Sequence, residues 1–171
     1  MLDGAAQCHA GRDWTGVTPW LEIAESYIGL KEIKGVGHNP TILGWLRDFG
    51  KNIGRWGKSR DETPWCAVFV SHCLASAGMT TTESALAASY VTYGKPSKLI
   101  PGAVIVIKRK KTGADSSTGS RAGFHVGFLV RITRDYFIIL GGNQGNSVSR
   151  RRFPRKRYEL VAARQPVARV P

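Results

Sequence analysis

The sequence predicts an α+β fold, with helices in the first half of the chain and an antiparallel sheet in the second. Before Pro101, apolar residues recur every three or four positions, which is typical of amphipathic helices. After Pro101, β-branched and aromatic runs are broken by turn residues, which indicates strands joined by short connections. The chain has 171 residues, 42% of them hydrophobic, which is enough to bury a core without disulfide bridges. A single domain over residues 19–171 is therefore expected.

Four helices are expected, after an arm over residues 1–18 that is Gly- and Ala-rich, shows no period and should be loosely attached. The first helix reads PWLEIAESYIGL, with Thr18 as its cap and Pro19 in its first turn. The second reads NPTILGWLRDF and stops at Gly50. The third begins near Cys66 within DETPWCAVFVSHCLASAG, and the fourth is the short segment SALAASYVTY.

Five strands are expected in the second half, with the sequences GAVIVIKR, GFHVGFLVRIT, DYFIILGG, NSVSRRRF and YELVAARQ. Arg134 and Asp135 should form a tight turn between the second strand and the third. The polar, glycine-rich stretch KKTGADSSTGSRAG between the first two strands is expected to be a mobile loop.

The net charge of +13, from 25 Lys and Arg against 12 Asp and Glu, predicts attraction to a polyanion. Nucleic acid, anionic lipid and bacterial envelope polymers all qualify. The densest basic block is SRRRFPRKR, over residues 149–157, which fits a solvated edge strand as well as a polyanion site. Nucleic-acid binding would favour aromatic platforms among these cations, and Phe153 and Tyr158 are thin support for it.

No apolar run approaches the roughly 18 to 20 residues of a membrane-spanning helix. The first residues, MLDGAAQCHAGRDW, lack a basic segment followed by an apolar one, so no Sec-type signal peptide is expected.

The three cysteines Cys8, Cys66 and Cys73 are expected to be free thiols. Cys66 and Cys73 are seven residues apart on one predicted helix, about 10 Å, which exceeds the roughly 7 Å that a disulfide can bridge. That separation also argues against a shared zinc, and the sequence has no CxxC or HExxH pair. We therefore expect no metal and no cofactor, and assign Cys73 to the core.

Cys66 lies where a thiol would be activated, in the first turn of its predicted helix. With Thr63 as the cap and Pro64 at the first helical position, the helix dipole should lower the pKa of the Cys66 thiol. His125 is the expected base. Strand alternation places it on the opposite face from Phe124, Val126 and Phe128, from where it should face the start of the helix. The backbone N–H of Cys66 should bind an oxyanion.

A catalytic imidazole needs a polar partner on its second nitrogen. Asn143 and Gln144 follow the strand that pairs with the His125 strand, and either amide could be that partner. We favour Asn143, because its shorter side chain is better fixed after the flexible pair of glycines before it. Gln144 is then expected at the cleft rim, where it would bind substrate together with Trp65, which follows Pro64 directly.

The segments PWLEIAESYIGLKEIKGVGHNPTILGWL, DETPWCAVFVSHCLASAGM, HVGFLV and LGGNQGNSVS, in this order, resemble phage and prophage cell-wall hydrolases of the NlpC/P60 and CHAP superfamily, particularly an endolysin-like branch. The resemblance implies a papain-like fold with Cys66 as nucleophile and His125 as base. It maps the third catalytic residue to the strand that ends at Asn143. Many relatives carry a histidine there, and CHAP members often carry a glutamate two positions earlier, where this chain has Gly141.

These observations predict a peptidoglycan hydrolase that cleaves an amide bond of the stem peptide through a cysteine thioester, as an endopeptidase or amidase. It should act as a monomer on the bacterial cell wall, in the periplasm or murein layer, after release by a route such as a holin or a phage particle. Its basic surface should bind anionic envelope polymers. Two alternatives remain: an acyltransferase or deamidase with the same chemistry, or a cationic module for cell wall or nucleic acid with an inert cysteine.

Overall fold

The computed structural model describes residues 18–170, so the expected arm, including Cys8, lies outside the described residues except for Thr18. The helices come first, as expected. They are α1 (Pro19–Ser26), α2 (Pro40–Phe49), the 3₁₀ helix η1 (Gly57–Ser59), α3 (Cys66–Ser76) and the 3₁₀ helix η2 (Ala87–Thr92). The strands follow as β1 (Lys95–Pro96), β2 (Val104–Arg109), β3 (Phe124–Ile132), β4 (Tyr136–Gly141), β5 (Ser149–Pro154) and β6 (Tyr158–Gln165).

The described strands form one antiparallel sheet in the order β1-β6-β2-β3-β4-β5. The α+β class and the five long strands are thereby confirmed. The expected turn at Arg134 and Asp135 is also confirmed, because the N–H of Thr133 donates to the carbonyl of Tyr136 at 2.9 Å. Strand β1 was not predicted, since two residues carry no periodic signal.

The sheet curls strongly on itself. Strands β5 and β6 are separated by three strands in the sheet order, yet the rings of Phe153 and Tyr158 lie 5.1 Å apart. A compact apolar core fills the inside of this curl; its buried residues are Ala103, Ile105, Ile107, Leu129, Phe137, Ile139, Phe153 and Tyr158. The inner face of the sheet is therefore covered by the sheet itself.

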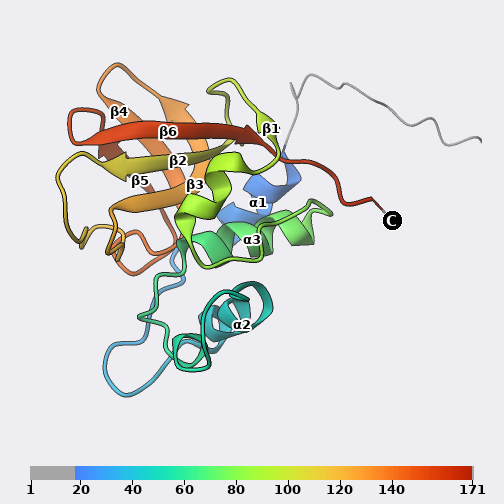
Figure 1. Cartoon of the computed structure of the whole chain (residues 1–171), viewed down its shortest axis with the longest axis vertical. Coiled ribbons are helices and arrows are strands. Elements are labelled where there is room, and N and C mark those ends of the chain that lie inside the picture. The colour runs from blue at the N-terminus through green and yellow to red at the C-terminus, as the bar shows by residue number, and fades with distance from the viewer. Residues whose placement is uncertain (1–17, 171) are drawn as a thin grey trace, which may run out of the picture.

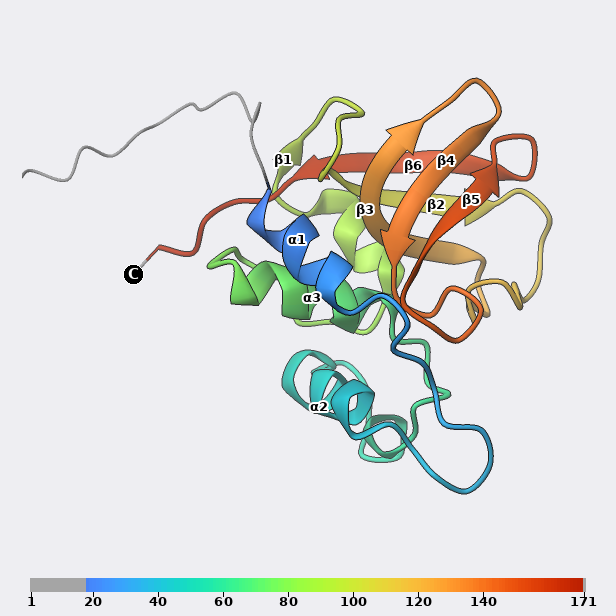
Figure 2. The same ribbon diagram turned by 180° about the vertical axis from the view of Figure 1, so that it is seen from behind.

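The outer face of the sheet packs against helices. Helix α3 is buried over most of its length, and α1, η2 and the sheet surround it (Figures 1 and 2). Helix α2 packs on the side of α3 away from the sheet, and Trp45 of α2 contacts Phe69 of α3 with ring centroids 5.3 Å apart. This second core joins all three helices to Val126 and Phe128 of β3.

The two predicted side-chain caps are not formed: Thr18 occupies the N-cap position of α1, but its side chain makes no capping hydrogen bond. Asn39 caps α2, its side chain accepting from the N–H of Thr41 at 2.9 Å. Thr63 does not cap α3: the helix begins at Cys66, and the Thr63 hydroxyl donates instead to the carbonyl of Gly57 at 2.7 Å. The expected fourth helix is a 3₁₀ helix.

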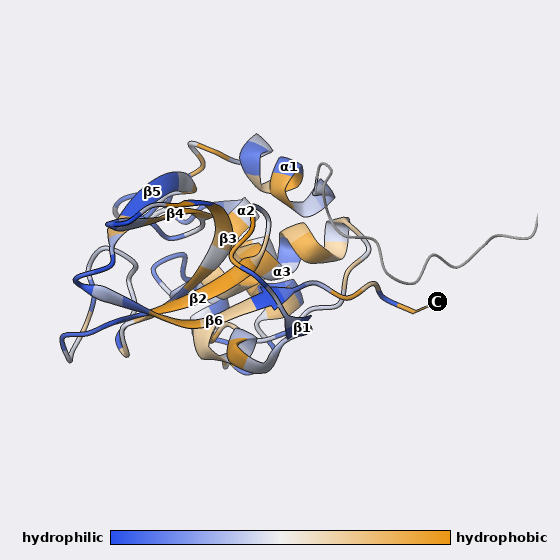
Figure 3. Cartoon of the chain, turned by 90° about the horizontal axis from the view of Figure 1, so that it is seen from above, coloured by the Kyte–Doolittle hydropathy of each residue, from blue (hydrophilic) through white to orange (hydrophobic). Residues whose placement is uncertain are grey.

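The basic block of residues 149–157 forms the edge strand β5 and the turn after it. Figure 3 shows β5 mostly hydrophilic and the central strand β2 mostly hydrophobic. Three of its arginines are engaged within the protein: Arg150 pairs with Glu25, Arg151 donates to the carbonyl of Ser117 at 3.3 Å, and Arg155 donates to the carbonyls of Thr133 and Arg134, each at 3.1 Å. A charged edge also discourages pairing with another chain's strand.

The loop between β2 and β3, expected to be mobile, is anchored by Asp115. This residue is buried, its carboxylate accepts from the hydroxyl of Tyr158 at 2.8 Å, and its N–H donates to the carbonyl of Ser120 at 2.7 Å. Among the described residues, no helix is long and apolar enough to cross a membrane.

Candidate functional site

Cys66 is the first residue of α3 and lies on the wall of a pocket of about 480 Å³. The backbone N–H groups at this end of the helix have no partner within the helix, so they point toward the pocket side of the chain. The opposite wall comes from the loop before β3, through Gly119, Ser120 and Arg121. The pocket is therefore the place where a ligand can meet the thiol.

Burial decides the protonation state of Cys66. The residue is only 2% exposed, and burial raises the pKa of its thiol to about 11, although the N–H groups of Val126, Ala67 and Cys66 itself favour the thiolate. The expectation that the helix end lowers the pKa is therefore wrong for this state of the protein. Three donors at the sulfur do not outweigh the loss of water around the charge.

His125 lies on the inner face of the sheet, whereas α3 packs on the outer face. Val126 and Phe128 belong to the core shared with α3, and the imidazole of His125 lies against Phe153 inside the curl, with ring centroids 5.2 Å apart. The alternation of β3 was predicted, but the face that meets α3 is the other one. The two residues are still close along the backbone, because the N–H that stabilises the Cys66 sulfur belongs to Val126, the residue after His125.

Gln144, and not Asn143, makes the hydrogen bond to His125. Its Oε1 lies 3.0 Å from His125 Nε2. Its own amide group is held in place, since Nε2 of Gln144 donates to the carbonyls of Ser149 at 2.5 Å and Ile139 at 3.2 Å. An oxygen at this position can only accept, so Nε2 of His125 carries the proton. The other ring nitrogen, Nδ1, is then a lone-pair acceptor.

Nδ1 of His125 is buried and has no hydrogen-bond partner in the described chain, Cys66 included. Burial lowers the pKa of His125 to about 4, although Gln144 acts in the opposite direction. The imidazole is therefore neutral at pH 7. The free lone pair of Nδ1 is available to accept a proton.

Asn143 has a different role from the one expected. It adopts a left-handed backbone conformation, with φ of 56°, and its side chain lies against Gly119 on the pocket wall. Its Oδ1 is buried without a partner. The turn at Asn143 swings the chain so that the following residue, Gln144, enters the curl, which explains why the two amides exchange their expected places.

Trp65 and Gln144 were expected to bind substrate at the rim, and both are buried instead. The indole of Trp65 is 0% exposed and packs against Gly142, where an added Cβ would lie 2.5 Å from the ring. Its Nε1 donates to Glu32 at 2.8 Å. Burial raises the pKa of Glu32, against the effect of this hydrogen bond. Trp65 therefore supports the start of α3 and is not among the residues that line the pocket.

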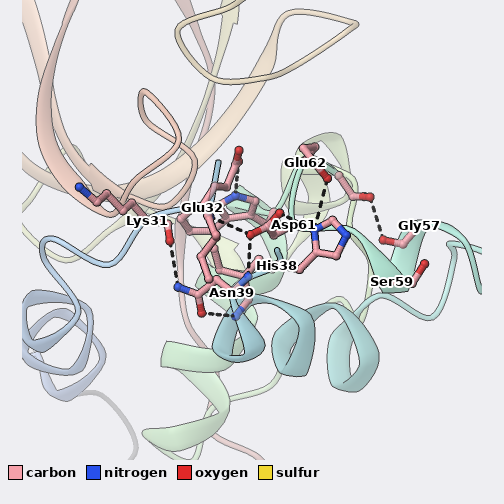
Figure 4. A network of polar contacts seen from close by, with 12 residues as sticks. Lys31, Glu32, His38, Asn39, Gly57, Ser59, Asp61 and Glu62 are labelled. Atoms are coloured by element: carbon pink, nitrogen blue, oxygen red, sulfur yellow. Dashed lines mark hydrogen bonds and ion pairs between the residues drawn. The ribbon is translucent and has the colours of Figure 1, made fainter. Parts of the chain in front are cut away.

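A buried carboxylate, Asp61, ties the segment before α3 to the loop before α2 (Figure 4). It accepts from the N–H of Asn39 at 2.7 Å and of Ile33 at 3.1 Å, and lies 3.0 Å from Nδ1 of His38. His38, Asp61 and Glu62 offer three ligand atoms within 4.8 Å of one another, the single such group in residues 18–170. Because the Asp61 oxygens already accept these bonds, the three residues need no metal to hold them together. The absence of a metal stays a prediction.

The pocket mouth carries charges that the sequence reasoning did not single out. Arg60, Glu62 and Arg121 line the pocket together with the small side chains of Ala85, Ala87 and Ala88. Their positions depend on loops, for which periodicity gives no signal.

No known protein family, curated protein or solved structure matches the chain. The function must therefore be argued from the geometry of the pocket and from the chemistry of its residues.

Proposed function

We propose that the protein is a cysteine hydrolase with a papain-like arrangement, related to the NlpC/P60 and CHAP superfamily, that cleaves amide bonds in peptidoglycan. The observation that carries the proposal is the neutral His125, held by Gln144 at one nitrogen and left with a free lone pair at the other, one residue before Val126, whose N–H stabilises the sulfur of Cys66. Nucleophilic catalysis by cysteine requires a base fixed in one tautomer and a thiol that it can reach, and a helix start favours such a thiol.

In this mechanism His125 Nδ1 accepts the thiol proton while Cys66 Sγ attacks the amide carbonyl. The backbone N–H of Cys66 stabilises the oxyanion of the tetrahedral intermediate. The imidazolium then protonates the amine as the C–N bond breaks, which leaves a thioester on Cys66. Water attacks the thioester with His125 as base, and the carboxylate product leaves as the thiol is restored.

The resting pair is neutral, because burial disfavours both the thiolate and the imidazolium. Proton transfer and attack are therefore coupled in one step, with no thiolate formed beforehand. Nδ1 and Sγ must approach within hydrogen-bond distance for this step, and such contacts in ligand-free enzymes often tighten only when substrate binds.

The pocket suits a short peptide with small side chains and both charges. Alanines are among its lining residues, Arg60 and Arg121 can bind carboxylates, and Glu62 can bind an amine. The stem peptide of peptidoglycan has this chemistry, with alanine residues, free carboxylates and an amino group. The same thioester passed to an amine instead of water would give an acyltransferase.

An inert cysteine is the competing hypothesis, and the burial of Cys66 with its high pKa favours it. Digestion of purified peptidoglycan, followed by mass spectrometry of the products, separates the two. Wild type and Cys73→Ser should release fragments with new amino groups, and Cys66→Ala should release none. Cys73→Ser is the matched control, because Cys73 is a second buried thiol on α3. Equal release by wild type and Cys66→Ala would refute the proposal that Cys66 is the nucleophile of a hydrolase.

A further inference from the structure

Among the exposed large apolar side chains of residues 18–170, Trp56 is the most exposed aromatic one, at 79%. It lies in the connection between α2 and α3, directly before the 3₁₀ helix η1. A large indole in water is unfavourable unless it serves an interface.

Four cations lie near this indole. Arg55, Lys58 and Arg60 are close to it in the sequence, and Arg47 shares a hollow with Arg55 and Lys58. Three of them, Arg47, Arg55 and Lys58, line a shallow hollow beside it with Ser59. In the described chain none of the four lies within 4.0 Å of a carboxylate, whereas Lys51 pairs with Glu83 at 2.6 Å and Arg150 pairs with Glu25. These charges are free to bind an anion. We call Trp56 and the four cations the Trp56 surface.

Arg60 joins the Trp56 surface to the pocket of Cys66. Its guanidinium stacks over the Trp56 ring at 5.6 Å from the centroid, and the same side chain lines the pocket. A ligand that occupies the pocket can therefore continue past Arg60 onto the indole without leaving the protein.

We propose that the Trp56 surface binds the glycan strand of an anionic glycopeptide polymer whose peptide branch enters the pocket. The indole offers a flat face for a sugar ring, and the free cations bind carboxylates along the polymer. The identity of the polymer as peptidoglycan rests on the proposed function. Single-stranded nucleic acid is disfavoured, because sites of that kind stack successive bases on several rings and this surface has one.

Binding of the full-length Cys66→Ala protein to insoluble, purified peptidoglycan tests the proposal, since this variant leaves the polymer intact whether or not the protein is an enzyme. Adding Trp56→Ala or Arg60→Gln should weaken binding about tenfold each, the loss typical of a central interface residue. Trp56→Phe should restore part of it. In the otherwise wild-type protein, Trp56→Ala should leave turnover of a small soluble stem peptide within about twofold.

The matched control is the other exposed aromatic that stacks with an arginine, Tyr136 with Arg152 at 6.0 Å. Tyr136→Ala and Arg152→Gln should bind like the parent. Equal losses at both pairs, or unchanged binding after Trp56→Ala, would overturn the proposal. The proposal would also be overturned if the protein bound a single-stranded oligonucleotide more tightly than peptidoglycan and Trp56→Ala abolished that binding. Loss of binding at Trp56 with no hydrolysis by the wild type would support this proposal while refuting the enzyme.

Discussion

At the residue scale, the site depends on which amide reaches His125. Asn143 and Gln144 are adjacent in the sequence, and the left-handed turn at Asn143 decides which of them enters the curl of the sheet. The sequence predicted that one of the two would bond the imidazole. It could not choose between them, because the choice depends on one backbone torsion.

Gln144→Ala should lower kcat by about 100-fold, because His125 loses the acceptor that fixes its tautomer and direction. KM should change little, since Gln144 is buried away from the pocket. Asn143→Gly, which keeps the left-handed backbone, should stay within about fivefold of wild type. Steady-state kinetics on a soluble stem peptide measure both variants. A larger loss of kcat for Asn143→Gly would return the orienting role to Asn143.

The protonation state of Cys66 predicts slow alkylation. With the pKa of the thiol raised to about 11, the thiolate fraction is small below that pH and rises tenfold per unit until then. At pH 8 iodoacetamide should modify Cys66 on the order of 100-fold more slowly than a free thiol of pKa about 8.5. Peptide mass spectrometry against time gives the rate for this residue alone. Fast modification at pH 6 would mean a thiolate already paired with imidazolium.

At the element scale, the sequence predicted the strands well because each long strand carries its own alternation and ends at turn residues. The start of α3 was placed two residues too early, since Thr63 and Pro64 form a good local start signal. The Thr63 hydroxyl found another acceptor in the folded chain. The link from Asp61 to the loop before α2 spans more than twenty residues, so no local pattern could reveal it.

Asp61→Ala should destabilise the protein by about 2 to 4 kcal/mol, because two backbone N–H groups and His38 lose their acceptor. Burial raises the pKa of Asp61, but the N–H of Asn39, His38 and the N–H of Ile33 outweigh it, so the pKa lies below the ordinary 3.8. The stabilisation is therefore complete above pH 3.8 and is lost as pH falls through the lower folded pKa.

Urea denaturation at pH 7 and at pH 3 measures this difference. The gap between wild type and Asp61→Ala should be smaller at pH 3 than at pH 7. The exposed Asp48→Asn is the control and should change stability by less than about 0.5 kcal/mol at either pH. A gap that does not depend on pH would show that the carboxylate charge contributes nothing.

At the scale of the whole molecule, the residue patterns predicted the α+β domain, and the net charge predicts a polyanion-binding surface without giving its place. The densest basic block is an edge strand in which Arg150 and Arg155 are already engaged. Within residues 18–170, Arg47, Arg55, Lys58 and Arg60 near Trp56 have no carboxylate partner either, and the sequence shows only a short RWGKSR segment there. The curl that brings His125 against Phe153 was also beyond prediction, because it depends on how six strands close together.

The central claim is that Cys66 forms a covalent acyl-enzyme with the help of His125. Rapid mixing of the protein with a soluble stem peptide, acid quench and intact-protein mass spectrometry test it directly. Wild type should gain the mass of the acyl fragment on Cys66 within one turnover, and Cys66→Ala should gain none. Product release by wild type without any adduct, or an adduct that persists in Cys66→Ala, would contradict the account.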